Sequence, residues 1–456
     1  MVKWFEEMTD SKIYILDVTN RDGVQTSRLG LAKLEKTILN ILLNRMGVHQ
    51  SELGFPTTYH EQNYINANLE LQDIGVLKPI ILSGWMRALT SEVELAVNRC
   101  PKLKAINLSI STSKQMISSK FAGKMSEEDV IKNMTAAVKR AKDLGIKKVG
   151  VNAEDASRTS LDYLIKFALA AKKAGADQIR YCDTLGYENP FRVHFRMKDL
   201  TKATDIPWEM HCHNDLGMAV ATSVVGAKGV LEEGQDCYIN TTVNGMGERA
   251  GNADLVSTVL ALKYGAEFDE LGMLDPSIDL SKAWRLANYA SYAFKVPIPV
   301  NQPGIGANAF AHESGIHADG ALKDHKNYEL YDFEVLGRGE TILLETGRLI
   351  TTGEYSGVHG FKHIMGNFQY EFKDDEEARQ VLELVRYANV QKQKPLVQEE
   401  FIFIAEYPQI AKRILTMTPP EITINRPYIE PELIKEEKKE KRFEKAQVQK
   451  DMLTRT

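Results

Sequence analysis

Two histidines, His211 and His213, lie one residue apart in the segment MHCHNDLG, residues 210–217. If a β-strand runs through this segment, both imidazoles project from the same face, because side chains alternate along a strand. Two such imidazoles can bind one metal ion. An isolated pair can equally be one histidine that caps the next helix and another that is satisfied in the core. The spacing alone leaves both interpretations open.

Short apolar runs alternate with amphipathic helical patterns through the first part of the chain. The helical pattern SEEDVIKNMTAAVKRAKDLG, for example, begins at a serine and ends at a glycine. Eight runs are predicted strands: 12–16, 51–55, 79–82, 105–110, 148–152, 178–182, 208–212 and 237–243. Eight alternating units predict an α/β fold in which a parallel (β/α)8 TIM barrel closes, with a doubly wound sheet as the alternative.

The alternation stops after residue 267, so residues 1–267 are predicted to form the catalytic barrel. A proline-rich connector, KVPIPVNQPGIG, follows within residues 268–365, a predicted linker and subdomain that carries the segment HESGIH. Residues 366–456 are predicted to form a helical C-terminal subdomain with a charged tail. The fold class is therefore a TIM barrel with mainly helical C-terminal subdomains.

Composition excludes several classes of protein. The 456 residues carry a net charge of −5, which offers no basic surface for nucleic acid. No apolar run approaches the roughly 20 residues that span a membrane, and the N-terminus resembles neither a signal nor a transit peptide. Four cysteines without CxxC spacing predict reduced thiols. We expect a cytoplasmic protein that binds neither nucleic acid nor membrane.

The barrel gives the histidine pair two neighbours. Side chains that follow the strands meet at the carboxyl ends of a barrel, so Asp22 after the first strand and Asn252 after the last should lie beside His211 and His213. Two imidazoles and two oxygens suit a hard or borderline divalent ion, namely Mn²⁺, Mg²⁺, Co²⁺ or Zn²⁺.

The glycine-rich segment NGMGERAGN, residues 244–252, has the spacing GxGxxxG, which is not the fingerprint of a dinucleotide-binding loop. We expect its Glu248 and Arg249 to point inward.

Five motifs resemble one family of enzymes. RDG (21–23), AEDASR (153–158), HCHND (211–215), NGMGERAGN (244–252) and HESGIHADGALKD (312–324) are similar to segments of the metal-dependent synthases that condense an acyl-CoA with a 2-oxo acid. That family includes isopropylmalate, homocitrate, citramalate and Re-type citrate synthases. The resemblance spans residues 10–400 and implies acetyl-CoA and a 2-oxo acid as substrates. It also implies a divalent metal, Mn²⁺ first, and a homodimer with active sites shared between subunits.

The resemblance also implies a role for each matching residue. Asp22, His211, His213 and Asn252 would hold the metal, and Arg21 would stabilise the growing alkoxide. His317, working with Glu154, would be the general base that deprotonates the acetyl methyl group. The remaining positions would contact the oxo acid or hold the ligands in place: Gln25, Glu52, Arg87, Ser113, Thr184 and Glu209.

Departures from the family pattern narrow the choice of 2-oxo acid substrate. The usual DTTLRDGEQ is DVTNRDGVQ here, with Asn20 for leucine and Val24 for glutamate, and GEYSG (353–357) replaces KHSG. Gly150 stands where lysine-pathway homocitrate synthases carry an arginine for 2-oxoglutarate. This combination looks most like the Re-type citrate synthases, which condense oxaloacetate with acetyl-CoA. The alternatives are a homocitrate synthase, then an isopropylmalate or citramalate synthase, an acyl-CoA lyase that would not need His317, and a metal-binding protein without catalysis.

Overall fold

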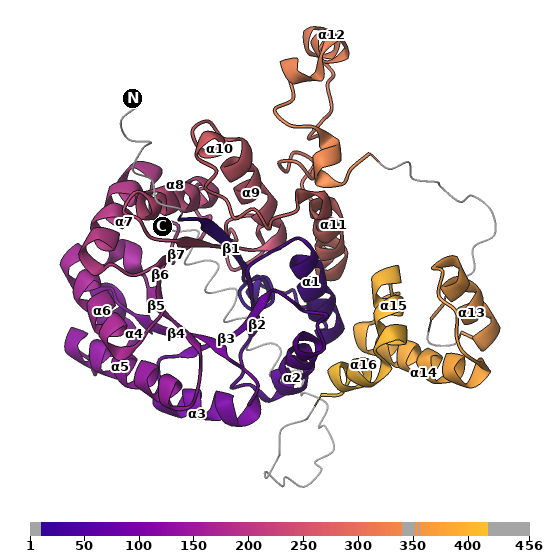
Figure 1. Ribbon diagram of the computed structural model, residues 1–456, viewed down its shortest axis with the longest axis horizontal. Helices are drawn as coiled ribbons and strands as arrows, with labels where there is room; N and C mark the ends of the chain where they lie inside the picture. The colour runs from indigo at the N-terminus through magenta and orange to yellow at the C-terminus, as the bar shows by residue number, and fades with distance from the viewer. Residues whose placement is uncertain (1–10, 340–351, 354–355, 418–456) are drawn as a thin grey trace, which may run out of the picture. The chain divides into compact units, whose positions relative to one another are not determined.

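The computed structural model describes residues 11–339, 352–353 and 356–417. Its centre is a ring of strands (Figure 1), and the ring contains eight of them. These are β1 (Ile13–Asp17), β2 (Gln50–Gly54), β3 (Ile81–Arg87), β4 (Ala105–Ser111), β5 (Lys148–Glu154), β6 (Gln178–Asp183), β7 (Trp208–Cys212) and β8 (Cys237–Thr241). Each strand pairs in parallel with the next, and β1 pairs with β8 from Ile13↔Cys237 to Asp17↔Thr241. The predicted closed barrel is confirmed.

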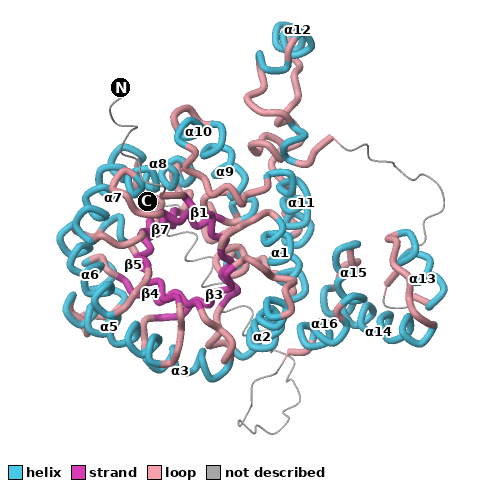
Figure 2. The backbone as a smooth tube through the Cα atoms, in the orientation of Figure 1, coloured by secondary structure: helices cyan, strands magenta, loops and turns pink. Residues whose placement is uncertain are grey.

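A ring of helices surrounds the strands, as Figure 2 shows in cyan outside the magenta strands. It consists of α1 (Lys33–Arg45), α2 (Tyr59–Asp73), α3 (Thr90–Arg99), α4 (Lys114–Lys120), α5 (Glu127–Asp143), α6 (Leu161–Ala174), α7 (Pro190–Thr204), α8 (Ala219–Leu231) and α9 (Leu255–Tyr264). The local sequence sets their starts. Ser126 caps helix α5: its side chain accepts from the Asp129 backbone, and the Asp129 side chain accepts from the Ser126 backbone in return, which forms a capping box.

The third strand differs from the prediction. The apolar run at residues 79–82 predicted a strand that ends before Gly84, but β3 continues to Arg87 and pairs with β4 along Ser83–Arg87. A Cβ at Gly84 would lie 2.3 Å from Pro56 Cγ, so the glycine allows close packing rather than a turn. The boundary prediction failed because the pairing with β4, which is not local in sequence, extends the strand.

The part of the chain after the barrel is mainly helical, as predicted. Its helices are α10 (Phe268–Leu271), α11 (Ala283–Phe294), α12 (Gly315–Lys323), α13 (Val358–Asn367), α14 (Asp375–Lys392), α15 (Gln398–Glu406) and α16 (Pro408–Leu415). The charged tail, in residues 418–456, and Glu354 and Tyr355 of GEYSG lie outside the described residues. None of the described helices is both long enough and apolar enough to cross a membrane.

A buried ionic cluster fastens the C-terminal helices to the barrel. Lys392 of α14 lies 3.5 Å from the Glu35 carboxylate of α1 and also pairs with Glu400 of α15. Tyr289 of α11 donates to Glu400 over 3.0 Å. All four side chains are buried. Because removing one partner would leave a buried charge uncompensated, the cluster holds α14 and α15 in one position against α1 and α11.

Candidate metal centre

The two histidines and Asp22 converge at the carboxyl ends of β7 and β1. His211 Nε2 lies 3.4 Å and His213 Nε2 lies 3.9 Å from Asp22 Oδ2, and the three side chains are buried. The ligand atoms that they offer all lie within 4.8 Å of one another. Asp22 directly precedes the short 3-10 helix η2 (Gly23–Gln25). One ion could therefore contact all three residues.

Asn252 reaches the same place through the glycine-rich loop after β8. Its backbone forms an antiparallel bridge with His213, and its side chain is buried. Two glycines permit this approach. A Cβ at Gly247 would lie 2.1 Å from Asn252 Nδ2, and Gly251, at φ +87°, would carry its Cβ 2.0 Å from the Gly245 carbonyl oxygen. The loop thus brings Asn252 beside the histidine pair.

The donor atoms of this cluster fit a divalent cation. Asp22 Oδ2 and Asn252 Oδ1 are buried without a hydrogen-bond partner among the described residues, whereas buried polar atoms are normally satisfied. Burial lowers the pKa of His211 and of His213, so both imidazoles are neutral and keep a lone pair at neutral pH. Two neutral imidazoles with carboxylate and amide oxygens are ligands for Mn²⁺, Mg²⁺, Co²⁺ or Zn²⁺.

Arg21 connects the cluster to the barrel interior. Its Nε donates to Glu52 Oε2 over 2.8 Å, its Nη1 lies 3.1 Å from Asp22 Oδ1, and its guanidinium lies 5.6 Å from the Trp85 ring centre. Burial alone would raise the pKa of Asp22, but the adjacent guanidinium of Arg21 is the largest of the effects that lower it to about 2. Asp22 is therefore ionised at every physiological pH, and a fixed cation lies beside it.

A buried arginine, Arg180, extends this network across the barrel. Its Nη2 lies 2.5 Å from Glu52 Oε1 on β2 and 2.6 Å from Glu209 Oε1 on β7. The two predicted residues Glu52 and Glu209 are thus brought together by a residue that the sequence reasoning missed. The sequence does contain an indication of this role. Arg180 lies in an apolar strand, two residues before Cys182, where a buried charge needs a partner of opposite charge.

The structure accounts for one of the two departures from the family pattern in the segment DVTNRDGVQ, residues 17–25. Asn20 is fully buried, and its Nδ2 donates to the Lys36 carbonyl oxygen and to Asn40 Oδ1 of α1, each over 2.9 Å. The asparagine thus ties the loop that carries Arg21 to α1. Val24 is partly buried against the core, and nothing in the structure explains why it replaces glutamate.

The proposed general-base pair is not assembled within the chain. Glu154 at the end of β5 accepts from Ser111 and from Lys120 Nζ, which lies 2.7 Å away. His317 lies in α12, is exposed, and stacks on Tyr328 with ring centroids 4.4 Å apart. No contact joins His317 to Glu154 within the part of the chain that the structure describes. The pairing of these two residues stays a prediction.

The other predicted residues lie at the mouth without joining the cluster. Ser113 donates to Asp155 Oδ2, and Thr184 Oγ1 accepts from the Asp155 backbone over 2.9 Å, so both fasten the AEDASR segment. Gln25 is exposed at the end of η2. Arg87 is exposed and pairs with Glu92 of α3. Their roles towards an oxo acid stay predictions.

The expectation that Glu248 and Arg249 point inward is wrong. The Glu248 side chain is 55% exposed, because the loop directs only Asn252 toward the histidines. Arg249 is exposed too, and its Nε donates to Asp215 Oδ1 over 2.9 Å. This ion pair, together with the Asn214 side chain that accepts from the Ala219 backbone, shapes the turn after HCHND.

Fold and site together define a class of protein: a parallel (β/α)8 barrel with a candidate divalent-metal centre at the carboxyl ends of its strands. Residues 12–289 match the family model described as HMGL-like, and residues 305–393 match that of the homocitrate synthase post-HMGL domain. The chain belongs to the HMGL-like family, in the branch of synthases that carry this second domain.

Named relatives place the chain further within the family. It is 59% identical over 409 residues to Citrate (Re)-synthase of Dehalococcoides mccartyi, covering 90% of this chain and 99% of that protein. It is 38% identical to 2-isopropylmalate synthase 2 of Caldanaerobacter subterraneus, covering 87% and 96%, and 33% identical to homocitrate synthase 1 of a Nostoc species, covering 86% and 96%. A solved HMG-CoA lyase from Bacillus subtilis, 16% identical and with a TM-score of 0.52 over 64% of this chain and 96% of its own, shares the fold.

Proposed function

We propose that this protein condenses acetyl-CoA with oxaloacetate to give citrate and CoA. The observation that carries the proposal is the 59% identity to Citrate (Re)-synthase over 99% of that relative's length. The buried Asp-His-His-Asn cluster supports it, because condensation on a keto group needs a centre that orients the 2-oxo acid and stabilises charge on its keto oxygen.

Asp22, His211, His213 and Asn252 would hold a divalent ion, with Mn²⁺ the first expectation. Such an ion, when bound, supplies Lewis-acid polarisation of the keto group. The chain supplies the rest. Arg21 is fixed between Glu52, Asp22 and Trp85, so its charge is already in position for the alkoxide that develops as the new C–C bond forms, without reorganisation.

The acetyl methyl group must lose a proton before it attacks. His317 would take that proton, the methyl carbon would bond to the keto carbon of oxaloacetate, and water would then cleave the thioester to release CoA. In this chain His317 is exposed on α12 and Glu154 is held by Ser111 and Lys120. We therefore propose that the base acts on the barrel of a second subunit, in a homodimer with shared sites.

Subunit mixing tests that arrangement. Inactive Asp22→Asn and His317→Ala homodimers, unfolded together and refolded, should regain about a quarter of the wild-type activity, because half of the dimers are mixed and each mixed dimer holds one intact site. Each variant refolded alone is the control. If the mixture stays inactive while size-exclusion chromatography with light scattering shows mixed dimers, the sites are not shared.

One position favours oxaloacetate over the longer 2-oxoglutarate. A Cβ at Gly150 would lie 2.0 Å from Asn107 Oδ1, and the Asn107 amide donates to Glu52 Oε1 over 2.5 Å. Asn107 thus fills the place next to Gly150, and this position offers no charged side chain to the distal carboxylate of 2-oxoglutarate. This supports the shorter dicarboxylate, because the homocitrate synthases of the lysine pathway use an arginine at that position.

Steady-state rates of CoA release test the substrate. Oxaloacetate, 2-oxoglutarate, 2-oxoisovalerate and pyruvate should be compared with Mn²⁺ and acetyl-CoA present. We expect kcat/KM to be highest for oxaloacetate by at least about a hundredfold, as for a pocket built around one distal carboxylate. A clear preference for another acid would contradict the proposal. The same rates, measured after the protein is loaded with Mn²⁺, Mg²⁺, Co²⁺ or Zn²⁺ in turn, test which metal ion supports the reaction.

The location of the protein in the cell is also a proposal. All four cysteines are free and buried, and burial raises the pKa of Cys100 to about 12 and that of Cys182 above its usual range. Such thiols are inert and need no oxidising environment, which supports a cytoplasmic location. Fractionation of the cells that make the protein, with a cytoplasmic marker enzyme as the control, checks it.

A further inference from the structure

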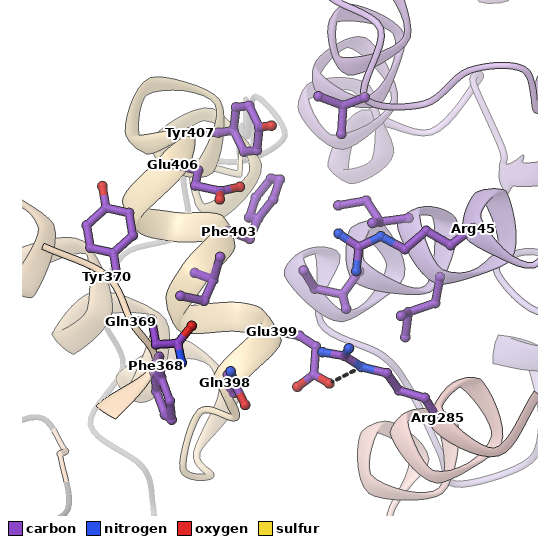
Figure 3. A pocket seen from close by; sticks show the side chains of 15 residues that line it. Arg45, Arg285, Phe368, Gln369, Tyr370, Gln398, Glu399, Phe403, Glu406 and Tyr407 are labelled. Carbon is purple, nitrogen blue, oxygen red and sulfur yellow. Dashed lines mark hydrogen bonds and ion pairs between the residues drawn. The ribbon is translucent and has the colours of Figure 1, made fainter. Parts of the chain in front are cut away.

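The helices that follow the barrel are held in two different ways. Helix α15 is fastened to α11 by an ion pair, in which Arg285 Nε and Glu399 Oε1 lie 2.9 Å apart (Figure 3). Helix α12, in contrast, has no buried residue, and none of residues 312–330 is buried. Contacts inside this segment therefore have to set its shape and the direction of the His317 imidazole.

Tyr328 packs along one face of α12. Its ring centroid lies 4.4 Å from that of His317, and a Cβ at Gly320 would lie 2.3 Å from Tyr328 Cε2. Residues 317 and 320 are three positions apart, so they lie on the same face of the helix. Glycine leaves the room that the tyrosine ring needs, and the ring covers one side of the imidazole. The direction of the imidazole thus depends on where Tyr328 is held.

Hydrogen bonds from both neighbours in the chain hold Tyr328 in this place. Asn327 donates from Nδ2 to the Gly320 carbonyl oxygen over 3.0 Å. On the other side, Glu329 Oε1 lies 3.0 Å from His312 Nε2, which closes the segment into a loop. The side chains of His312 and Glu329 are only 20% and 13% exposed, so water screens this bond less than it screens a fully exposed pair.

The first histidine of HESGIH, which is neither a metal ligand nor the base, thereby gains a task. We propose that His312 is a positioning residue. Its bond to Glu329 fixes Tyr328, and the ring of Tyr328 fixes the direction of the His317 imidazole. The inference rests on the proposed role of His317 as the general base. A base misplaced by about 1 Å can lose up to about a hundredfold in rate, so the bond acts on turnover rather than on substrate binding.

NMR of the full-length protein, labelled with ¹³C at histidine Cε1, tests the positioning without any assay of activity. The chain has 10 histidines, and the signal that disappears in His317→Ala belongs to His317. Tyr328→Leu should move this signal, because the ring beside the imidazole is gone. His312→Ala should move it in the same direction and leave the signals of His49 and His194, which lie in the barrel, in place. An unmoved His317 signal in His312→Ala overturns the proposal.

Steady-state kinetics test the consequence for turnover. His312→Ala should lower kcat about ten- to a hundredfold and leave KM for both substrates unchanged. His312→Gln should keep most of the rate, since its amide nitrogen can donate to Glu329 from the place of Nε2. Asp319→Asn, which breaks an exposed pair with Lys323 in the same helix, is the matched control and should turn over like the wild type. A wild-type kcat in His312→Ala overturns the inference.

A double variant separates this inference from the proposed function. If His312 acts through His317, then His312→Ala should cost nothing further in a His317→Ala background, because the two residues act as a unit. An equal loss in both backgrounds overturns the inference and leaves the base assignment intact. Full turnover in His317→Ala alone overturns the base assignment, and with it the effect that we expect on kcat.

Discussion

The ligand cluster on the barrel strands and the helix that carries His317 differ in almost every physical respect. Asp22, His211 and His213 are buried, lie on or beside β-strands, and are connected through Arg21 to a network of ion pairs. Helix α12 has no buried residue, and His317 contacts the ring of Tyr328 beside it. One half of the candidate active site is therefore preorganised within the chain, while His317 contacts none of the cluster residues in the part of the chain that the structure describes.

The difference agrees with the different chemistry that we propose for the two halves. Ligands of a metal have to be held within fractions of an ångström, which strands and buried ion pairs achieve. A general base that meets its substrate only after both substrates have bound is suited to a mobile or intersubunit element. Damage to the barrel half should therefore change metal binding and stability, whereas damage to α12 should change turnover alone.

Removal of a metal ligand should have the largest effect. Asp22→Asn keeps the size of the side chain but removes its charge, so we expect weaker binding of Mn²⁺ and a loss of kcat on the order of a thousandfold or more. Metal titration and steady-state kinetics measure the two quantities. The matched control is Asp73→Asn, an exposed surface carboxylate. Unchanged turnover in Asp22→Asn would remove the barrel cluster from the mechanism.

Substitution of the base should leave the barrel half intact. We expect His317→Ala to lower kcat about 10²- to 10⁴-fold, the usual contribution of a general base, with Mn²⁺ affinity and the circular dichroism spectrum unchanged. His325→Ala, another exposed histidine just after α12, is the control. Turnover that survives in His317→Ala would favour a lyase over a synthase.

Loss of Arg180 should destabilise the barrel. In Arg180→Met the buried carboxylates of Glu52 and Glu209 lose their shared cation, and we expect the free energy of unfolding to fall by about 3–5 kcal/mol. Arg140→Met, which breaks an exposed ion pair with Glu94, should cost no more than about 1 kcal/mol. Denaturant unfolding of both variants measures the difference. Equal costs would show that the network does not hold the site rigid.

Acid should weaken the same network. Burial alone would raise the pKa of Glu52, but Arg180 and Arg21 lower it from 4.5 to about 2. A lowered pKa in the folded state means that the stabilisation is fully present above pH 4.5 and is lost as the pH falls toward 2. The shift corresponds to on the order of 3 kcal/mol. The free energy of unfolding, followed from pH 6 to pH 3, should fall less steeply in Glu52→Gln than in the wild type.

Local patterns in the sequence were enough for the architecture. The strand alternation and the helix starts and stops predicted all eight barrel strands, because each unit must bury its own apolar face. Strand ends were less accurate, as β3 shows, since pairing with β4 is decided by residues more than 20 positions away. The convergence of Asp22, His211, His213 and Asn252 followed from closure of the barrel alone.

The sequence by itself determined the barrel, the order of its motifs and the residue types at its mouth, because these depend on local periodicity and spacing. Only the tertiary structure decided which charged side chains lie close enough to pair with one another. It showed that Arg180 joins Glu52 to Glu209 across the barrel, that Glu154 and His317 remain apart in one chain, and that His312 pairs with Glu329. Electrostatic partners depend on distances of a few ångströms between residues far apart in the chain, and no local pattern encodes such distances.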